Sequence, residues 1–268
     1  EREIAVGLSS WFREDTSGQR ELIGSPERHG EIWLRVLEEI DEAGLLDSLL
    51  YVDLCNEWPD KTWAPFYRHD GRDDADWGTD PSREWMRRAI EVLRSHYPQL
   101  DYTFSFASHL FDRTEVDLGM LDFFEPHTWM TRDSDFYDRI GYTYQKFTNE
   151  GYLRVAKYAE PLYRNAADYW EEILKRNIDA IAQWSRRQGK RLVTTEAWAI
   201  VDYKDWPGLD WEWVKELNEM AVRWASETGR WAAICSSNFC GPQFRGNWND
   251  TAYHRRTTDR IRSGQIEG

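Results

Sequence analysis

Cysteine is scarce in this chain, with Cys55, Cys235 and Cys240 as its three residues. An odd count at wide spacing gives no disulfide framework. Cys55 and Cys235 fall within apolar, strand-like runs, which indicates buried free thiols. No CxxC or HExxH spacing occurs either. We therefore predict neither a bound metal nor another cofactor.

Long apolar runs are also missing. No stretch approaches the roughly 18 residues that a membrane span needs, so no membrane partner is expected. No signal peptide is visible, and the chain starts at Glu1 instead of methionine, which indicates a processed or trimmed N-terminus. Secreted, periplasmic and cytoplasmic locations therefore all stay open, and the sequence leaves the oligomeric state undetermined.

Positive charge is in deficit, because 34 Lys and Arg face 48 Asp and Glu, for a formal net charge of −14. A polyanion repels phosphate backbones, so nucleic acid is not an expected partner. Glycine-rich phosphate loops are absent after the strand-like runs, which argues against a nucleotide-binding sheet.

Tryptophan, by contrast, is abundant, with 16 residues among 268. A chain of this length can bury the core of one large α/β domain, and some indoles must pack there. Others are free to meet a ligand. Sugar rings are one such ligand, since their C–H faces lie flat on aromatic rings.

Strand-like and helix-like segments alternate along the chain. Strand candidates cover 4–8, 49–54, 102–106, 121–124, 191–195 and 231–235, and helix candidates cover 25–44, 80–97, 166–187, 210–229 and 252–262. Ser25-Pro26 is typical of a helix start and Gly44 of a helix end. The polar and aromatic stretch from Thr131 to about Asn165 exceeds ordinary connection lengths, so we expect an insertion with a function or some structure of its own.

Six strand-then-helix units without a linker predict a parallel sheet covered by helices, in a single domain over residues 1–268. Two closures fit this pattern. One is an open doubly wound sheet and the other is a (β/α) barrel, and the pattern alone does not separate them.

Two glutamates directly follow strand-like runs. Asn56-Glu57 ends the run 49–55, and Glu196 ends the run 192–195. A carboxylate at a strand end is rarely there for packing, because burial would desolvate it without a partner. At the carboxyl ends of parallel strands, one carboxyl group can protonate a leaving oxygen while another attacks a sugar carbon. Glu57 and Glu196 are therefore the predicted catalytic residues.

The order strand-Asn-Glu followed by a later strand-Glu resembles the clan A glycoside hydrolases, the retaining (β/α)8 enzymes that include the family 5 cellulases and mannanases. The resemblance covers nearly the whole chain in architecture, although its specific motifs amount to a few residues. It implies a TIM barrel and a β-linked oligosaccharide or polysaccharide substrate. It further implies that Glu57 is the acid/base at the end of strand four and Glu196 the nucleophile at the end of strand seven.

The resemblance also implies sugar-binding residues. Asn56 would bond the 2-hydroxyl of the sugar. His127 would bond near the nucleophile, with Trp129 in place of the tyrosine of the family's His-x-Tyr. In the family, an aromatic residue after strand eight usually lies beneath the sugar that is attacked. This chain departs from that pattern, because the run 236–239 with Asn238 holds that place and Trp248 follows further on. Further candidates for the walls of the site are Trp58, Trp198 and Trp11, the last either a platform or a core residue.

Counting strands under this resemblance leaves the barrel incomplete. If Asn56-Glu57 ends strand four, then 4–8 is strand three, and strands one and two are absent. A barrel of eight cannot close with six, and the open edge would expose apolar parallel strands. We therefore expect this chain to supply about six β/α units, strands three to eight, of a longer and N-terminally incomplete barrel.

Other assignments stay open at this point. Glu125 also lies at a strand end and rivals the two glutamates as an acid. Asp53 would be a hydrogen-bonded structural residue, and His109 either a neighbour of the site or a loop histidine. A non-catalytic carbohydrate-binding barrel would keep the tryptophans, and a metal-dependent barrel hydrolase would use Asp53, His109 and His127 as ligands.

Overall fold

The computed structural model describes residues 4–12, 18–67, 76–107, 115–132, 134–144, 146–235 and 244–267. The fold is α/β and divides into two compact units. Unit 1 comprises Glu1–Ala107 and Arg113–Glu125, and unit 2 comprises Ser108–Asp112 and Pro126–Gly268. Among the described residues, every helix is too short or too polar to cross a bilayer.

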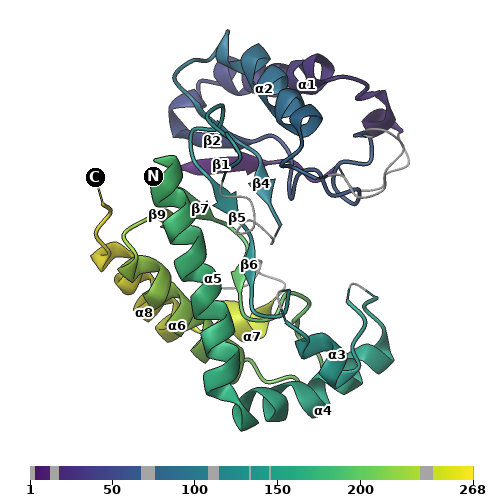
Figure 1. Ribbon diagram of the computed structural model, residues 1–268, viewed down its shortest axis with the longest axis vertical. Helices are drawn as coiled ribbons and strands as arrows, with labels where there is room; N and C mark the ends of the chain where they lie inside the picture. Colours follow the sequence, from purple (N-terminus) through teal and green to yellow (C-terminus); the bar gives the residue numbers. More distant parts are fainter. Residues whose placement is uncertain are drawn as a thin grey trace. The chain divides into compact units, whose positions relative to one another are not determined.

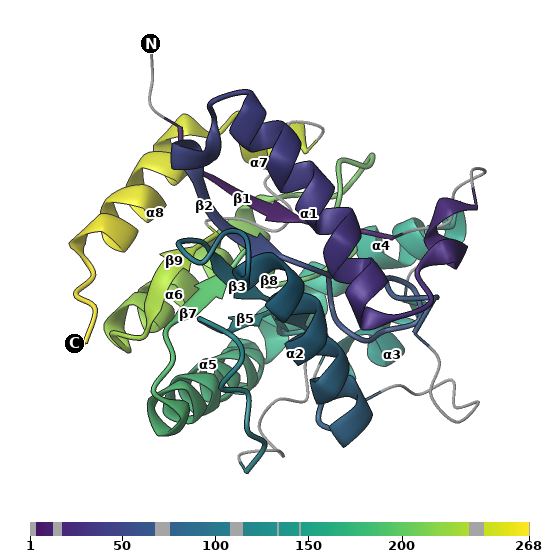
Figure 2. The same ribbon diagram turned by 90° about the horizontal axis from the view of Figure 1, so that it is seen from above.

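Unit 1 is built on a parallel sheet with the order β1-β2-β3, formed by β1 (Val6–Ser9), β2 (Leu49–Asp53) and β3 (Asp101–Thr103). The helices α1 (Pro26–Glu42) and α2 (Asp80–Arg94) lie side by side on this sheet (Figures 1 and 2). The short helices η1 (Gln19–Leu22) and η2 (Leu46–Ser48) flank α1 in sequence. Beyond β3, the chain forms β4 (Ser105–Phe106), which pairs with β5 (Glu125–Pro126).

The local sequence explains where the helices of unit 1 begin and how closely they pack. The Ser25 side chain caps α1, and the Thr79 side chain caps α2, each ahead of a proline in the first turn. Gly30 of α1 lies against α2, where a Cβ atom would be 2.6 Å from the backbone oxygen of Ala89. Glycine at this position therefore permits the close approach of the two helices.

Unit 2 contains two short parallel strand pairs. β6 (Thr128–Trp129) pairs with β8 (Ala197–Trp198), and β7 (Leu192–Thr194) pairs with β9 (Trp231–Ile234). The long helices α5 (Ala167–Gln188), α6 (Glu212–Glu227) and α8 (Thr251–Ser263) lie side by side, with α6 in the middle (Figures 1 and 2). The remaining helices of this unit are α3 (Phe136–Ile140), α4 (Asn149–Asn165) and α7 (Arg245–Trp248).

The predicted elements are found with shifted ends, except near residue 121. The run 121–123 is not a strand, and β5 begins only at Glu125. The reason lies in the side chain of Asp122. Its carboxylate accepts the backbone N–H of Tyr102 at 2.8 Å, a hydrogen bond that a backbone carbonyl would accept in a regular sheet. Arg94 holds the same carboxylate at 2.9 Å. The insertion expected over 131–165 does have its own structure, namely α3 and α4.

The α/β class and the parallel strand pairing are confirmed. Among the described residues, the sheets contain two or three strands each, and no closed barrel is assigned. The eight-stranded barrel, the six β/α units and the single catalytic domain over residues 1–268 therefore stay predictions.

Candidate active site

Glu57 lies just beyond β2, where the chain turns sharply. Its backbone has a φ of 45°, in the left-handed region that few residues other than glycine adopt. The turn is held by Ser105, whose hydroxyl oxygen accepts the Glu57 N–H at 2.9 Å. The Glu57 carboxylate is 4% exposed, and its Oε2 accepts the indole N–H of Trp63 at 2.8 Å. This bond fixes the direction in which the carboxyl group points.

Asp53 anchors the strand ends that carry this turn. The hydroxyl of Ser9, at the end of β1, donates to Asp53 Oδ2 at 2.6 Å. The backbone N–H groups of Ser105 and Cys55 donate to Oδ1 at 2.8 and 3.3 Å. With 1% exposure, Asp53 is a buried link between β1, β2 and β4, as expected for a structural carboxylate.

Asn56 is 2% exposed, and its backbone N–H donates to the carbonyl of Ser10 at 3.0 Å. Its side-chain nitrogen Nδ2 is buried and has no acceptor among the described residues. An unpaired buried amide is costly, so it calls for an acceptor from outside the chain. A sugar hydroxyl is one such acceptor.

The two tryptophans predicted for the site in unit 1 have different positions. Trp58 is 1% exposed, donates its indole N–H to Ser82 Oγ at 2.8 Å and packs on Tyr67 with ring centroids 4.6 Å apart. Its polar atom and its ring are both used inside the core, so its role as a wall of the site stays a prediction. Trp11 is 44% exposed and lies 4.9 Å from the ring of Trp63, so it is a surface aromatic beside the partner of Glu57.

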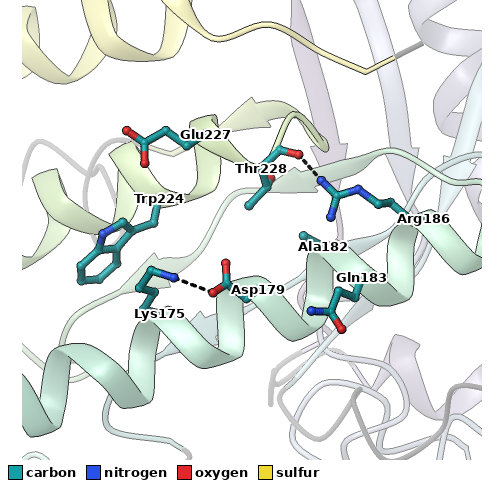
Figure 3. Close-up of a pocket in the computed structure, with 8 residues that line it drawn as sticks. All are labelled: Lys175, Asp179, Ala182, Gln183, Arg186, Trp224, Glu227 and Thr228. Carbon is teal, nitrogen blue, oxygen red and sulfur yellow. Dashed lines mark hydrogen bonds and ion pairs between the residues drawn. The ribbon is translucent and has the colours of Figure 1, made fainter.

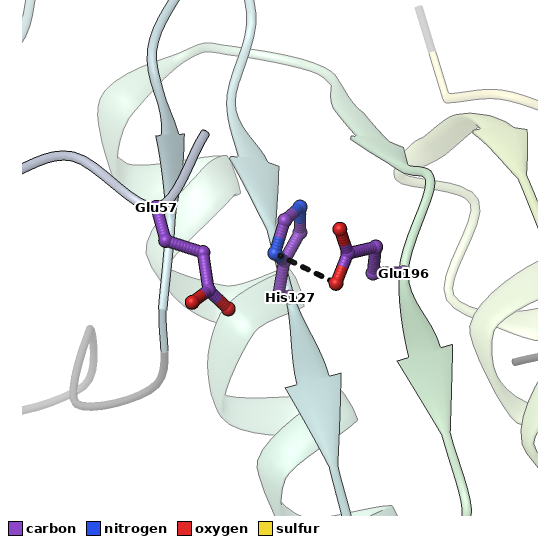
Figure 4. A group of neighbouring side chains, drawn as sticks. All are labelled: Glu57, His127 and Glu196. Atoms are coloured by element: carbon purple, nitrogen blue, oxygen red, sulfur yellow. Dashed lines mark ion pairs between the residues drawn. The ribbon is translucent and has the colours of Figure 1, made fainter. Parts of the chain in front are cut away.

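Glu196 and His127 form a buried pair in unit 2 (Figure 4). Glu196 stands between β7 and β8 and is 8% exposed, while His127 stands between β5 and β6 and is 1% exposed. The imidazole Nδ1 lies 3.6 Å from the carboxylate Oε2, and the two groups point toward one another. A proton on Nδ1 would stabilise the ionised carboxylate, which is the form that attacks carbon.

The neighbours of this pair are tied together through Thr194. Its hydroxyl donates to the carbonyl of Pro126 at 3.0 Å and accepts the indole N–H of Trp231 at 2.8 Å. Pro126 precedes His127, and Thr194 is two residues before Glu196. Directly after His127 and Glu196, the chain enters β6 and β8, which pair in parallel and hold the two segments together. The backbone therefore holds the histidine and the carboxylate in register.

Three other predicted residues of unit 2 can be placed. Trp129 and Trp198 are fully buried, and the Trp198 indole donates to the carbonyl of Cys235 at 3.2 Å. Neither exposes a face in this structure, so their role as walls stays a prediction. Trp248, at the end of α7, is 47% exposed and open to a ligand. Asn238 and His109 lie outside the described residues.

Glu125 is a third strand-end acid. It begins β5, directly before Pro126, and is 1% exposed. A carboxyl group this deeply buried requires hydrogen bonds or a proton. Glu125 therefore stays a candidate acid beside the two predicted catalytic glutamates.

No sequence pattern points to Trp63, Ser105 or Thr194, which nevertheless hold the two glutamates and their neighbours. Trp63 lies in a stretch without regular secondary structure, six positions beyond Glu57. Ser105 and Thr194 act through single hydroxyl groups in short strands. Contacts of this kind follow no periodicity, so only the folded backbone reveals them.

Parallel strands covered by helices, with buried carboxylates at the strand ends and exposed tryptophans, are features that carbohydrate-active α/β proteins combine. A sequence model of the family described as sugar-binding cellulase-like matches residues 1–262. The chain therefore belongs to the cellulase-like family, and the resemblance to cellulase-like glycoside hydrolases is confirmed at that level.

A solved structure agrees with this family. A crystal structure from Parabacteroides distasonis, provisionally described as a glycoside hydrolase, is 41% identical with a TM-score of 0.92, over 98% of this chain and 71% of that chain. The cellulose synthase subunit Z of Clostridioides difficile is 13% identical with a TM-score of 0.47, over 96% of this chain and 73% of that chain. A comparison with curated proteins finds no match.

Proposed function

We propose that this protein is a retaining glycoside hydrolase that cleaves β-linked glycosides, with Glu196 as nucleophile and Glu57 as acid/base. The observation that carries the proposal is the buried pair of Glu196 and His127, with Nδ1 3.6 Å from Oε2 at the end of a parallel strand. Membership of the cellulase-like family and the 41% identical neighbour support the same reaction class. The strands would belong to a (β/α)8 barrel, which presents catalytic residues at its strand ends.

In the first step, the ionised Glu196 carboxylate attacks the anomeric carbon and forms a glycosyl ester. The bond to the leaving oxygen breaks, and Glu57 gives that oxygen its proton. The bond from Trp63 directs the Glu57 carboxyl group, and Asn56 Nδ2 donates to the sugar 2-hydroxyl, where the interaction strengthens in the transition state. The mechanism requires the two carboxyl groups to stand about 5–5.5 Å apart.

In the second step, Glu57 is ionised and takes a proton from water. The water oxygen attacks the anomeric carbon from the face that the leaving group vacated, and the ester bond to Glu196 breaks. Two inversions at the same carbon return the original configuration. The enzyme ends with Glu57 protonated and Glu196 ionised, ready for the next cycle.

Replacement of Glu196 tests the nucleophile. We expect Glu196→Ala to abolish hydrolysis of aryl β-glycosides and azide to restore it, with a glycosyl azide of inverted configuration as product. Glu172→Ala, on the exposed face of α5, is the matched control and should turn over normally. Near-normal turnover of Glu196→Ala would refute the assignment.

Replacement of Glu57 tests the acid. Glu57→Ala should spare substrates with activated leaving groups far more than natural glycans, because a good leaving group needs no proton. Equal losses on both kinds of substrate would argue against an acid role.

Sugar binding without hydrolysis is the second candidate function, and the family description as sugar-binding favours it. Exposed Trp11 and Trp248 would serve a binding protein as well as an enzyme. Saturable glycan binding by the wild type, with no release of reducing sugar, would select this candidate. A metal-dependent hydrolase would instead lose turnover in the presence of a chelator.

A further inference from the structure

A hollow of about 280 Å³ lies in unit 2 between α5 and α6 (Figure 3). We call it the Trp224 groove. Its lining includes Lys175, Asp179, Gln183, Arg186, Trp224 and Glu227, and Glu196 is not part of it. Figure 3 shows Trp224 reaching from α6 toward Lys175 on α5. The groove is therefore built wholly from one unit and is separate from the strand ends.

Trp224 is the aromatic residue of this groove. The core face of α6 is formed by buried residues such as Trp213, Leu217 and Ala221, whereas Trp224 is only partly buried. The Trp224 side chain makes no hydrogen bond and no ring contact within the described part of the chain. Its indole N–H and part of its ring are therefore available to a ligand.

The polar rim of the groove is balanced in charge. Lys175 and Asp179 form an ion pair of 2.6 Å, and Arg186 and Glu227 add one charge of each sign. Gln183 is exposed and its side chain makes no hydrogen bond to any residue that the structure describes, so its amide offers both donors and an acceptor. Balanced charge selects neither a polyanion nor a cation. It suits a neutral ligand with many hydroxyl groups.

We propose that the Trp224 groove is a second carbohydrate-binding site, which holds a neutral β-linked glycan with one sugar ring on the Trp224 indole. The inference rests on the proposed function for the class of ligand. The volume of 280 Å³ is near the lower end of ligand pockets, about 300–1,000 Å³, and suits one ring of a longer chain. A site of this kind keeps a polymer on the protein without cleaving it.

Affinity electrophoresis tests this site, with native gels that contain hydroxyethylcellulose, glucomannan or xylan. We expect at least one of these to retard the wild type. Trp224→Ala should raise the Kd of that glycan about tenfold, which corresponds to about 1.4 kcal/mol. Gln183→Ala should raise it by roughly twofold to threefold, as loss of one exposed hydrogen bond would. Tyr158→Ala, which removes an exposed aromatic ring of α4, is the matched control and should bind like the wild type.

The same variants are then assayed on a small aryl β-glycoside, which fills only the active site. Unchanged kcat/KM for Trp224→Ala and Gln183→Ala supports a separate site. Equal retardation of wild type and both variants, or a wild type that no glycan retards, would overturn the proposal. If the protein has no hydrolytic activity but its retardation still depends on Trp224, the proposed function is contradicted and the glycan-binding site at the groove is supported.

Discussion

His29 provides the sharpest stability test, because the structure buries it completely inside unit 1. Its Nε2 lies 3.0 Å from the carbonyl oxygen of Leu54, and its Nδ1 accepts the indole N–H of Trp85 at 3.2 Å. These partners suit a neutral imidazole with its proton on Nε2. Burial lowers the pKa of His29 from 6.5 to about 4, although the hydrogen bond to Leu54 acts in the opposite direction.

The sign of the effect follows from the two pKa values. The unfolded chain takes up a proton near pH 6.5, while the folded protein resists it until about pH 4. The stability that depends on neutral His29 is therefore complete above pH 6.5 and is lost progressively as the pH falls toward about 4. At about 1.4 kcal/mol per pKa unit, the loss is ~3 kcal/mol in the free energy of unfolding.

His29→Gln removes this titration. The variant should be less stable than the wild type near neutral pH, because it loses the ring contacts with Phe12 and Phe104. The difference between the two proteins should then shrink by ~3 kcal/mol from about pH 7 to about pH 4. Urea unfolding followed by tryptophan fluorescence measures it, with His96→Gln, an exposed position two residues beyond α2, as the control. A difference that stays constant over this range would refute the reasoning.

Three further predictions concern hydrogen bonds in the described residues. Asp53→Ala should lower the free energy of unfolding by ~3 kcal/mol, because it leaves the Ser9 hydroxyl and the backbone N–H groups of Cys55 and Ser105 without this acceptor; urea unfolding with no loss would contradict its role as a link. Trp63→Phe should keep an aromatic ring but remove the N–H that binds Glu57, so kcat/KM should fall roughly tenfold, and an unchanged value would exclude that bond from catalysis. Asp205→Ala should lower Tm by about 2–4 °C, because Asp205 accepts the indole N–H of Trp211 at 2.7 Å and the backbone N–H of Gly246 at 3.0 Å; calorimetry that shows no shift would contradict it.

The helices and parallel strands were predictable because their signals are local. Ser25 with Pro26 marks the start of α1, and the apolar period of α2 places Met86 and Ile90 in the core. The strand expected at 121–124 was wrong in its position, because the carboxylate of Asp122 replaces a backbone acceptor. A side chain that replaces a backbone hydrogen-bond acceptor of the sheet leaves no trace in the hydrophobic periodicity of the sequence.

The candidate site was predictable only in its charged residues. Glu57, Glu196 and His127 follow strand-like runs, and a charge at such a position needs a reason. The structure places His127 Nδ1 3.6 Å from Glu196 Oε2, and the role of the histidine beside a nucleophile stays a prediction. Tryptophan is harder to assign, because the same ring suits a core and a sugar. Trp58 packs in the core and Trp11 is exposed, and nothing in the sequence distinguishes them.

The central claim is that Glu196 forms the covalent bond to the sugar. The most direct measurement traps that intermediate with the 2-deoxy-2-fluoro analogue of the aryl β-glycoside that the enzyme cleaves best, followed by peptide mapping with mass spectrometry. We expect one added sugar per chain, esterified to Glu196. A label on Glu125 or Glu57 would contradict it, and so would an unlabelled enzyme that continues to turn over substrate.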